Sequence, residues 1–261
     1  MARNDEFACL AYLATSIPRI REARVVSLAM IESSAAIAVF VKTPGLSPVK
    51  TRLAMGIGHA AAKEFYLRSV AAVESTVAAV QSHGAAPYWA VAEREGMDDE
   101  HWKAFPAIDQ GKGGLGERLS RVFSDLKNMH QAVLLIGADS PQISATAICS
   151  AVQLLQTEQN TAVLGRCHDG GFYLVGANFS LPPDVWTGIQ YSTRKTAEQI
   201  TTRLQSFGRV LELPSITDVD DVRDLPILES ELRGNADQTN EQLAVLDWLE
   251  RHVSRPVGDV P

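Results

Sequence analysis

From residue 35 onward, short apolar runs alternate with longer segments in which hydrophobic residues recur at helical spacing. The apolar runs predict strands over 36–41, 86–92, 132–138, 161–165, 171–176 and 209–214. The helical spacing predicts helices over 60–81, 117–129, 143–158, 193–205, 221–232 and 238–252. Such alternation is typical of a mostly parallel sheet layered with helices. The Gly-Gly turn before 171–176 predicts that this strand pairs with 161–165 as a hairpin.

Length and composition narrow the class of protein. A chain of 261 residues that is 46% hydrophobic and 21% charged fits one globular α/β domain with a sizeable core. No apolar run approaches the ~20 residues of a membrane-spanning helix. A net charge of −7 argues against a broad nucleic-acid or membrane-binding surface, so a small-molecule partner is expected. Cys9, Cys149 and Cys167 form neither a disulfide framework nor a zinc motif, which favours the cytoplasm.

The motif-bearing region defines the expected domain. We expect an N-terminal extension over 1–34, a main α/β domain over 35–233 and a C-terminal helix and tail over 234–261. The extension has acidic residues near its start and no continuous apolar core, unlike a signal peptide. It is either an added helix or sequence upstream of a natural start at Met30, and we favour the second.

The first cluster of candidate chemistry is the turn VFVKTPGLSPVKTRLA, residues 39–54. It nearly spells a P-loop, but Val49 stands where that motif has its second glycine, and Pro48 has no N–H to donate. What remains is three cations, Lys42, Lys50 and Arg52, around a stiff turn. We expect them to grip a polyphosphate through side chains; the alternative is a solvated loop.

The second cluster, QGKGGLGERL over 110–119, contains the pattern G-x-G-x-x-G at Gly111, Gly113 and Gly116. With Asp139 further on, this pattern is compatible with a dinucleotide-binding oxidoreductase. The preceding segment AFPAIDQ is short and broken by Pro106, which disfavours that interpretation. A flexible loop that touches a base or a sugar explains the glycines equally well.

Carboxylates follow three further strands, and those after two of the strands are candidates for binding a metal. Asp139, in GADSP, ends the clearest strand and is a natural ligand for Mg²⁺ or Mn²⁺; the alternative is a helix cap, a role that Ser140 can also fill. Asp218 and Asp220 precede the last acidic helix and are free to reach a metal. Because ligands bind beyond the carboxyl ends of strands in open α/β sheets, these clusters are expected to converge.

The remaining carboxylates have simpler alternatives. Asp169 precedes Gly170 and Gly171, which predict a hairpin turn but also allow a ligand to approach the backbone. Asp169 is therefore a candidate for holding a sugar hydroxyl or an acceptor. Asp221 and Asp224 are explained by the start of a helix, where acidic residues are favoured by the dipole.

The motifs KTPGLSPVKTRL, QGKGGLGERL, GADSP, DGGFYLVG and DVDDVRDL, in this order, resemble the rSAM/selenodomain-associated transferase family, some members of which are described as arsenosugar-biosynthesis-type glycosyltransferases. That family belongs to the GT-A-like nucleotide-diphospho-sugar transferase superfamily. The resemblance implies a GT-A-like three-layer α/β/α sandwich with a mostly parallel central sheet, and a nucleotide bound under the first loop. Two departures are Leu46-Ser47 in place of Pro-Gly, and Asp139-Ser140-Pro141 in place of D-x-D.

The motifs and the resemblance together give expected roles for single residues. Asp139 and Asp169 would be catalytic, Asp139 and Asp220 would bind the metal, and Asp169, Gly170 and Gly171 would bind substrate. The expected nucleotide-binding residues are Lys42, Pro44, Lys50, Arg52, Gln110, Gly114, Leu115 and Gly116.

Four functions remain open from the sequence. The first is a glycosyltransferase that uses Mg²⁺ or Mn²⁺, a nucleotide sugar and a small-molecule acceptor, acting as a monomer or homodimer. The second is a nucleotidyltransferase on the same scaffold, in which a phosphate attacks a nucleoside triphosphate and pyrophosphate leaves. A nicotinamide-dependent oxidoreductase and a non-catalytic nucleotide sensor are the others. Fold does not decide among them.

Overall fold

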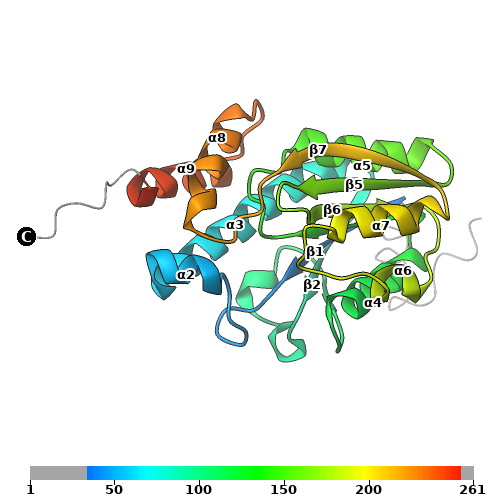
Figure 1. Ribbon diagram of the computed structural model, residues 1–261, viewed down its shortest axis with the longest axis horizontal. Coiled ribbons are helices and arrows are strands. Elements are labelled where there is room, and N and C mark those ends of the chain that lie inside the picture. Colours follow the sequence, from blue (N-terminus) through cyan, green and yellow to red (C-terminus); the bar gives the residue numbers. More distant parts are fainter. Residues whose placement is uncertain (1–33, 254–261) are drawn as a thin grey trace, which may run out of the picture.

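A seven-stranded sheet forms the centre of the molecule (Figure 1), which a computed structural model describes over residues 34–253. The strands are β1 (Ala35–Val41), β2 (Ala85–Val91), β3 (Ala107–Asp109), β4 (Ala132–Gly137), β5 (Thr161–Cys167), β6 (Phe172–Ala177) and β7 (Arg209–Ile216). Their order is β3-β2-β1-β4-β6-β5-β7. Every neighbouring pair is parallel except those of β6, which runs antiparallel to β4 and β5.

Helices cover both faces of the sheet (Figure 1). On one face lie α3 (His59–Val80) and α5 (Ala145–Thr157); on the other lie α4 (Leu115–Lys127), α6 (Pro183–Thr187) and α7 (Thr196–Gln205). Successive residues of a strand point to opposite faces, so Ile37 packs with the first group and Ala38 with the second. Burial on both faces explains why β1 is a continuous apolar run rather than an alternating one.

Three further helices make an additional layer on the outer side of α3. They are α2 (Thr51–Ile57), α8 (Leu225–Gly234) and α9 (Asn240–Val253). Their buried residues form a third hydrophobic cluster with the outer face of α3, in which the rings of Phe65 and Trp248 lie 5.2 Å apart. The helix expected within 234–261 is therefore α9, and it packs directly against the domain.

The strands and long helices predicted from the sequence are present, and the α/β sandwich is confirmed. The hairpin of β5 and β6 is confirmed as well. Two short helices were not predicted, α2 and α6, because each lies beside prolines in a segment too short to show helical periodicity. The helix predicted over 221–232 begins as a 3₁₀ turn, η4 (Val222–Asp224), and continues as α8.

The remaining 3₁₀ turns are η1 (Gln81–His83), η2 (Arg94–Gly96) and η3 (Glu100–Trp102). The expectation for the N-terminal extension concerns residues that lie, apart from Ser34, outside the described range. No helix within 34–253 is long and apolar enough to cross a membrane.

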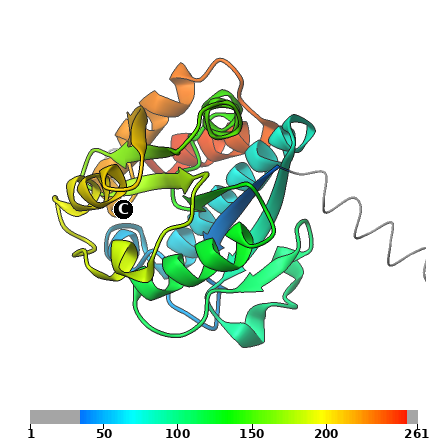
Figure 2. The ribbon, with the colours of Figure 1, turned by 90° about the vertical axis from the view of Figure 1, so that its right-hand side faces the viewer.

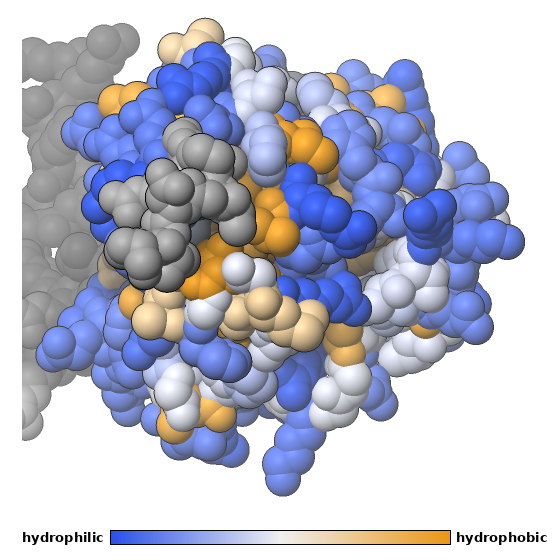
Figure 3. Space-filling model, turned by 60° about the vertical axis from the view of Figure 1, so that its left-hand side comes forward, coloured by the Kyte–Doolittle hydropathy of each residue, from blue (hydrophilic) through white to orange (hydrophobic). Residues whose placement is uncertain are grey.

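Strand β1, dark blue in Figure 2, runs through the middle of the molecule between β2 and β4. The face drawn in Figure 3 is mostly hydrophilic, with hydrophobic residues gathered near its centre. Among the exposed large hydrophobic side chains are Leu46, in the first loop, and Leu115, at the start of α4. Both positions adjoin the carboxyl edge of the sheet, where the candidate site lies.

Candidate active site

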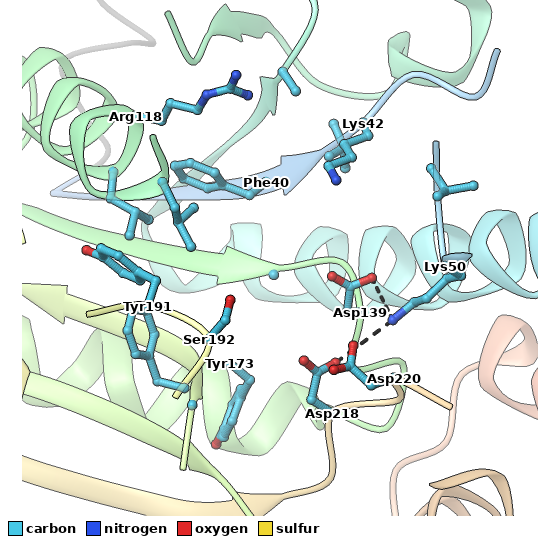
Figure 4. A pocket seen from close by; sticks show the side chains of 18 of the residues that line it. Phe40, Lys42, Lys50, Arg118, Asp139, Tyr173, Tyr191, Ser192, Asp218 and Asp220 are labelled. Carbon is cyan, nitrogen blue, oxygen red and sulfur yellow. Dashed lines mark ion pairs between the residues drawn. The ribbon is translucent and has the colours of Figure 1, made fainter. Parts of the chain in front are cut away.

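A cavity of about 950 Å³ opens at the carboxyl edge of the parallel strands (Figure 4). Its walls come from the loops that follow β1, β2, β3, β4, β5 and β7, together with the start of the antiparallel β6. These are the loops that carry the five predicted clusters. The expected convergence of the clusters is therefore observed.

Hydrogen bonds with two side chains outside the loop, Tyr66 and Glu93, hold the loop over 42–50 in place. The Tyr66 hydroxyl on α3 accepts a hydrogen bond from the Lys42 N–H (2.8 Å) and donates one to the Lys42 carbonyl (2.9 Å). The Thr43 N–H donates to the Glu93 carboxylate at 2.7 Å. At its end, Lys50 adopts a left-handed backbone (φ 46°) and forms the N-cap of α2. The loop is thus a defined structure that directs the Lys50 side chain into the cavity.

Lys50 is the centre of the charged end of the cavity. Its ammonium lies 2.8 Å from Asp139 Oδ1 and 3.9 Å from Asp218 Oδ1, and it donates to the Val219 carbonyl at 2.6 Å. The Lys50 side chain is only 6% exposed, whereas that of Asp139 is 50% exposed. Burial by itself lowers the pKa of Lys50, but the facing carboxylates outweigh it and raise the pKa above its ordinary value. Lys50 is therefore a fixed positive charge.

Asp218 is the least satisfied carboxylate of this group. Its Oδ1 atom is buried and has no hydrogen-bond partner among the described residues. Burial, against the opposing effect of Lys50, raises the pKa of Asp218 to about 7, and the negative charges of Asp139, Asp220 and Asp169 add to the rise. Ionisation of Asp218 is therefore unfavourable in the ligand-free cavity.

Asp220 and Arg52 form a second, outer pair. The Arg52 guanidinium Nη1 lies 2.6 Å from Asp220 Oδ2, and both side chains are about half exposed or more. Asp220 lines the cavity, and one of its carboxylate oxygens is bonded to Arg52. Of the two predicted carboxylates, Asp218 is the one that forms an ion pair with Lys50, marked by a dashed line in Figure 4.

Polar side chains of the outer helices hold the loops that carry these carboxylates. Glu231, on α8, accepts hydrogen bonds from the Thr217 N–H and hydroxyl and from the Gln142 side chain, and it lies 3.5 Å from His168. Gln242, on α9, donates to the carbonyls on either side of Gln142 at 2.8 and 2.9 Å. The positions of Asp139, Asp169 and Asp218 are therefore linked through α8 and α9.

The donor set suits a metal shared with a ligand better than a site made of protein alone. Within residues 34–253 no three His, Cys, Asp or Glu side chains are grouped as a metal site. Asp139 is half exposed toward the cavity and Asp218 has an unpartnered oxygen, so both offer hard oxygen donors. Mg²⁺ commonly takes one or two carboxylates and completes its shell with substrate phosphates and water. The residues present fit that arrangement.

The glycine-rich loop after β3 forms the opposite end of the cavity. Gln110 is buried, and its side-chain amide donates to the Val41 and Ala90 carbonyls, so that amide belongs to the sheet edge. At the start of α4 the Gly114 N–H donates to the Glu117 carboxylate. Gly116 is packed tightly, because an added Cβ would lie 2.6 Å from the Trp186 carbonyl oxygen. These contacts give Gln110, Gly114 and Gly116 structural roles in the motif.

The Asp169 turn is partly structural too. Its Oδ1 accepts from the Gly171 N–H at 2.9 Å, which leaves the second oxygen for a ligand. Gly170 has φ 95°, and a Cβ there would lie 2.2 Å from the Arg194 carbonyl oxygen, so only glycine fits. Asp169 and Gly171 line the cavity.

Most of the predicted site residues share this cavity. Those that line it are Lys42, Lys50, Arg52, Gln110, Leu115, Asp139, Asp169, Gly171 and Asp220. Those that do not are Pro44, Gly114, Gly116 and Gly170. Pro44 shapes the first loop through a bridge with Ser47. Gly114 is the N-cap of α4, Gly116 lies in the first turn of that helix, and Gly170 provides the positive φ of the turn before β6.

The sequence prediction did not single out several residues of the cavity. They are Phe40, Tyr66, Arg118, Tyr173 and Tyr191. Arg118 belongs to the motif QGKGGLGERL, and a cation about one helical turn after a glycine-rich loop could have been recognised as a candidate ligand-binding residue. Tyr66 lies in an alanine-rich helix far from any motif, and its contact with Lys42 depends on the tertiary fold.

Comparisons with known proteins agree with this architecture. A family model described as an uncharacterized protein conserved in bacteria (DUF2064) matches residues 67–193. No curated protein matches the chain.

A solved structure from Desulfovibrio desulfuricans, provisionally assigned as a nucleotide-diphospho-sugar transferase, is 25% identical with a TM-score of 0.73, over 84% of this chain and 98% of that one. A cytidylyltransferase from Leptospira borgpetersenii gives 11% identity and a TM-score of 0.50, over 85% of this chain and 95% of that one. A 4-diphosphocytidyl-2C-methyl-D-erythritol synthase from Anaerococcus prevotii gives 10% and 0.50, over 78% and 99%. The chain therefore has the α/β fold of the nucleotide-diphospho-sugar transferases.

Proposed function

We propose that this protein transfers a sugar from a nucleotide-diphospho-sugar donor to a small-molecule acceptor. The observation that supports this most is the make-up of the cavity: one end holds cations and carboxylates, and the other holds apolar faces with a guanidinium. A nucleotide sugar has the same two-ended character, with a charged diphosphate next to a planar base. The similarity of the fold to that of the Desulfovibrio protein supports the same class.

The cations of the first loop are the proposed diphosphate-binding groups. Lys42 is exposed, and within the described residues its ammonium has no ion-pair partner. Arg52 is paired only with the exposed Asp220, so exchanging this partner for a phosphate costs little. When the bond between the anomeric carbon and the diphosphate oxygen breaks, negative charge grows on the departing diphosphate. Fixed cations at that point stabilise the transition state.

Asp139 and Asp218 are the proposed ligands of a bound Mg²⁺ or Mn²⁺, which would supply Lewis-acid stabilisation of the leaving diphosphate. Lys50 keeps the Asp139 carboxylate in place, since their charged groups lie 2.8 Å apart. Two observations support the choice of Asp218: its buried Oδ1 has no hydrogen-bond partner among the described residues, and it lies 3.9 Å from the ammonium of Lys50, which pairs with Asp139.

The acceptor side of the cavity is built from Asp169 and two tyrosines. The Asp169 oxygen that is not bonded to Gly171 is available to orient a hydroxyl of the sugar or acceptor. Tyr173 and Tyr191 donate their hydroxyl hydrogens to backbone carbonyls, at Pro214 and Trp186, so they present ring surface to the cavity. Aromatic faces beside a carboxylate suit a neutral, hydroxylated ligand.

Nucleotidyl transfer is the second candidate, and one residue favours it. In that reaction the attacking group is a phosphate, which needs a cation across from the first loop. Arg194 lines the cavity on that side, and no ion pair of its guanidinium occurs among the described residues. Arg166 does not serve, because it pairs with Glu212 at 2.7 Å and bonds Thr201. One free arginine is weaker support than the arrangement of Asp169 and the tyrosines.

The other two functions have less support. In the oxidoreductase alternative the N-terminus of α4 would receive a pyrophosphate, yet the Glu117 carboxylate binds the Gly114 N–H there. A sensor would use the same nucleotide contacts, so only turnover separates it from an enzyme.

Two assays test the proposal. A panel of nucleotide sugars incubated with Mg²⁺ or Mn²⁺ and no acceptor is expected to release nucleoside diphosphate slowly to water, with less release by Asp139→Asn. Nucleoside triphosphates with sugar phosphates are expected to give no pyrophosphate. Metal-dependent pyrophosphate release in the second assay would reverse the order of the two candidates. Binding without turnover in both would favour the sensor.

A further inference from the structure

The end of the cavity opposite Lys50 holds Arg118 and Phe40 (Figure 4). We propose that Arg118 selects the base of the nucleotide and requires a base edge that carries two adjacent hydrogen-bond acceptors. This inference rests on the proposed function, because it names which nucleotides the same cavity accepts.

Two anchors orient the Arg118 guanidinium. Its Nε donates to the Gly113 carbonyl at 3.0 Å, and Nη1 approaches the Gln110 side-chain oxygen at 3.4 Å. Of the five N–H groups of a guanidinium, these contacts use two. The other three have no partner among the described residues, and the side chain lines the cavity. A planar group that is fixed on one side presents its remaining donors to a ligand in a defined direction.

Apolar surface frames these donors. Phe40, at the end of β1, is only partly buried and lines the cavity next to Arg118 (Figure 4). Leu115, at the start of α4, is 46% exposed and lines it too. An exposed leucine and a phenylalanine ring that line the cavity together with a guanidinium suit a flat aromatic ligand with polar atoms on its edge.

Gln110 acts on this subsite through Arg118 and not by reading the base. Its amide nitrogen is committed to the Val41 and Ala90 carbonyls, and the orientation of this amide places its oxygen toward Arg118. Gln110 is thus a positioning residue, and Arg118 carries the recognition.

The chemistry of the donors limits the base. Neighbouring N–H groups of a guanidinium match two adjacent acceptors, as in the pairing of arginine with guanine N7 and O6. Cytosine offers the same pattern at N3 and O2. Adenine and uracil place a donor beside each acceptor on their exposed edges, which opposes an N–H of arginine. Guanine and cytosine nucleotides are therefore the expected ligands.

Calorimetric titration of the full chain with GDP, CDP, UDP, ADP and inorganic pyrophosphate tests this. The wild-type protein is expected to bind GDP or CDP about tenfold or more tightly than UDP and ADP. Comparison of the GDP titration with the CDP titration then shows which of the two bases the site prefers. Arg118→Met and Arg118→Lys are both expected to remove that preference, since lysine keeps the charge but lacks the fork. Pyrophosphate affinity should stay the same in both variants.

Arg121→Met is the matched control, because Arg121 lies on the same helix, pairs with Asp125 and does not line the cavity. It should keep the wild-type preference, and melting curves establish that each variant is folded. Equal affinity of the wild-type protein for all four nucleotides, or a preference that survives in Arg118→Met, would overturn the inference and leave the proposed function intact. No binding of any nucleotide or of pyrophosphate would overturn both.

Discussion

Replacing Asp218 with asparagine is expected to stabilise the ligand-free protein at pH 8. The reason is that the folded protein holds this carboxyl group where ionisation is unfavourable, with a pKa of about 7 against an ordinary value of 3.8. The folded state therefore keeps a proton that the unfolded state has released between about pH 4 and pH 7. Wild-type stability accordingly falls as the pH rises through this window, and it levels off above pH 7.

The size of the effect follows from the shift. About three pKa units correspond to about 4 kcal/mol at most, at roughly 1.4 kcal/mol per unit. Because about a third of the Asp218 side chain is exposed, solvent screening reduces this to on the order of 2 kcal/mol. For a domain of this size, that is a rise in Tm of about 4–8 °C.

The assay is thermal unfolding from pH 4 to pH 9 in a buffer with a chelator, so that bound metal does not contribute. Asp218→Asn should melt higher than the wild type at pH 8, and the two curves should converge near pH 4. Asp221→Asn is the control, because Arg223 lowers the pKa of that exposed carboxyl to about 2 and its ionised form caps η4. It should not raise Tm. A lower Tm for Asp218→Asn at pH 8, or a difference that persists at pH 4, would refute the reasoning.

Four further outcomes are expected. Arg52→Ala should weaken nucleoside diphosphate binding by about 1.5–3 kcal/mol in calorimetry without changing Tm, and unchanged affinity would remove Arg52 from the site. Asp139→Asn should abolish the metal-dependent part of nucleotide binding, which equal affinity of the wild type with and without a chelator would contradict. Glu231→Gln should lower the unfolding free energy by about 1–3 kcal/mol, because its amide places donors against the Thr217 and Gln142 donors; a chemical denaturation midpoint equal to that of the wild type would argue against this. Gly116→Ala should cost about 1–3 kcal/mol through its clash with Trp186, whereas Gly234→Ala, which meets nothing within 4 Å, should be neutral in the same measurement.

The sheet was predictable because its signals are local. A continuous apolar run such as the one that forms β1 indicates a strand that is buried on both faces, and the run can be recognised from consecutive residues alone. The approximate place of the site followed from the same pattern, since polar clusters come directly after strands. Short elements beside prolines, such as α2, carry no periodic signal and were missed.

The pairing of charges within the site could not be predicted from the sequence. Lys50 and Asp218 are 168 positions apart along the chain, and their approach depends on the left-handed backbone at Lys50 and on the packing of α8. It was likewise not predictable that the Gln110 amide nitrogen donates its hydrogen bonds to the Val41 and Ala90 carbonyls and is therefore not available to a ligand. Both facts arise from tertiary structure, where hydrogen-bond partners are distant in the chain.

The bonds from Gln242 to the backbone around Gln142 also bear on the order in which the protein matures during synthesis. All seven strands precede α9 in the chain, so a ribosome makes the loop that carries Asp139 long before it makes Gln242, which holds that loop. Until α9 has left the exit tunnel, the carbonyls of Pro141 and Ile143 lack their partners. A nascent chain that stops before residue 240 has every strand but not the support of its acidic loop. Acquisition of ligand binding should therefore lag behind formation of the sheet.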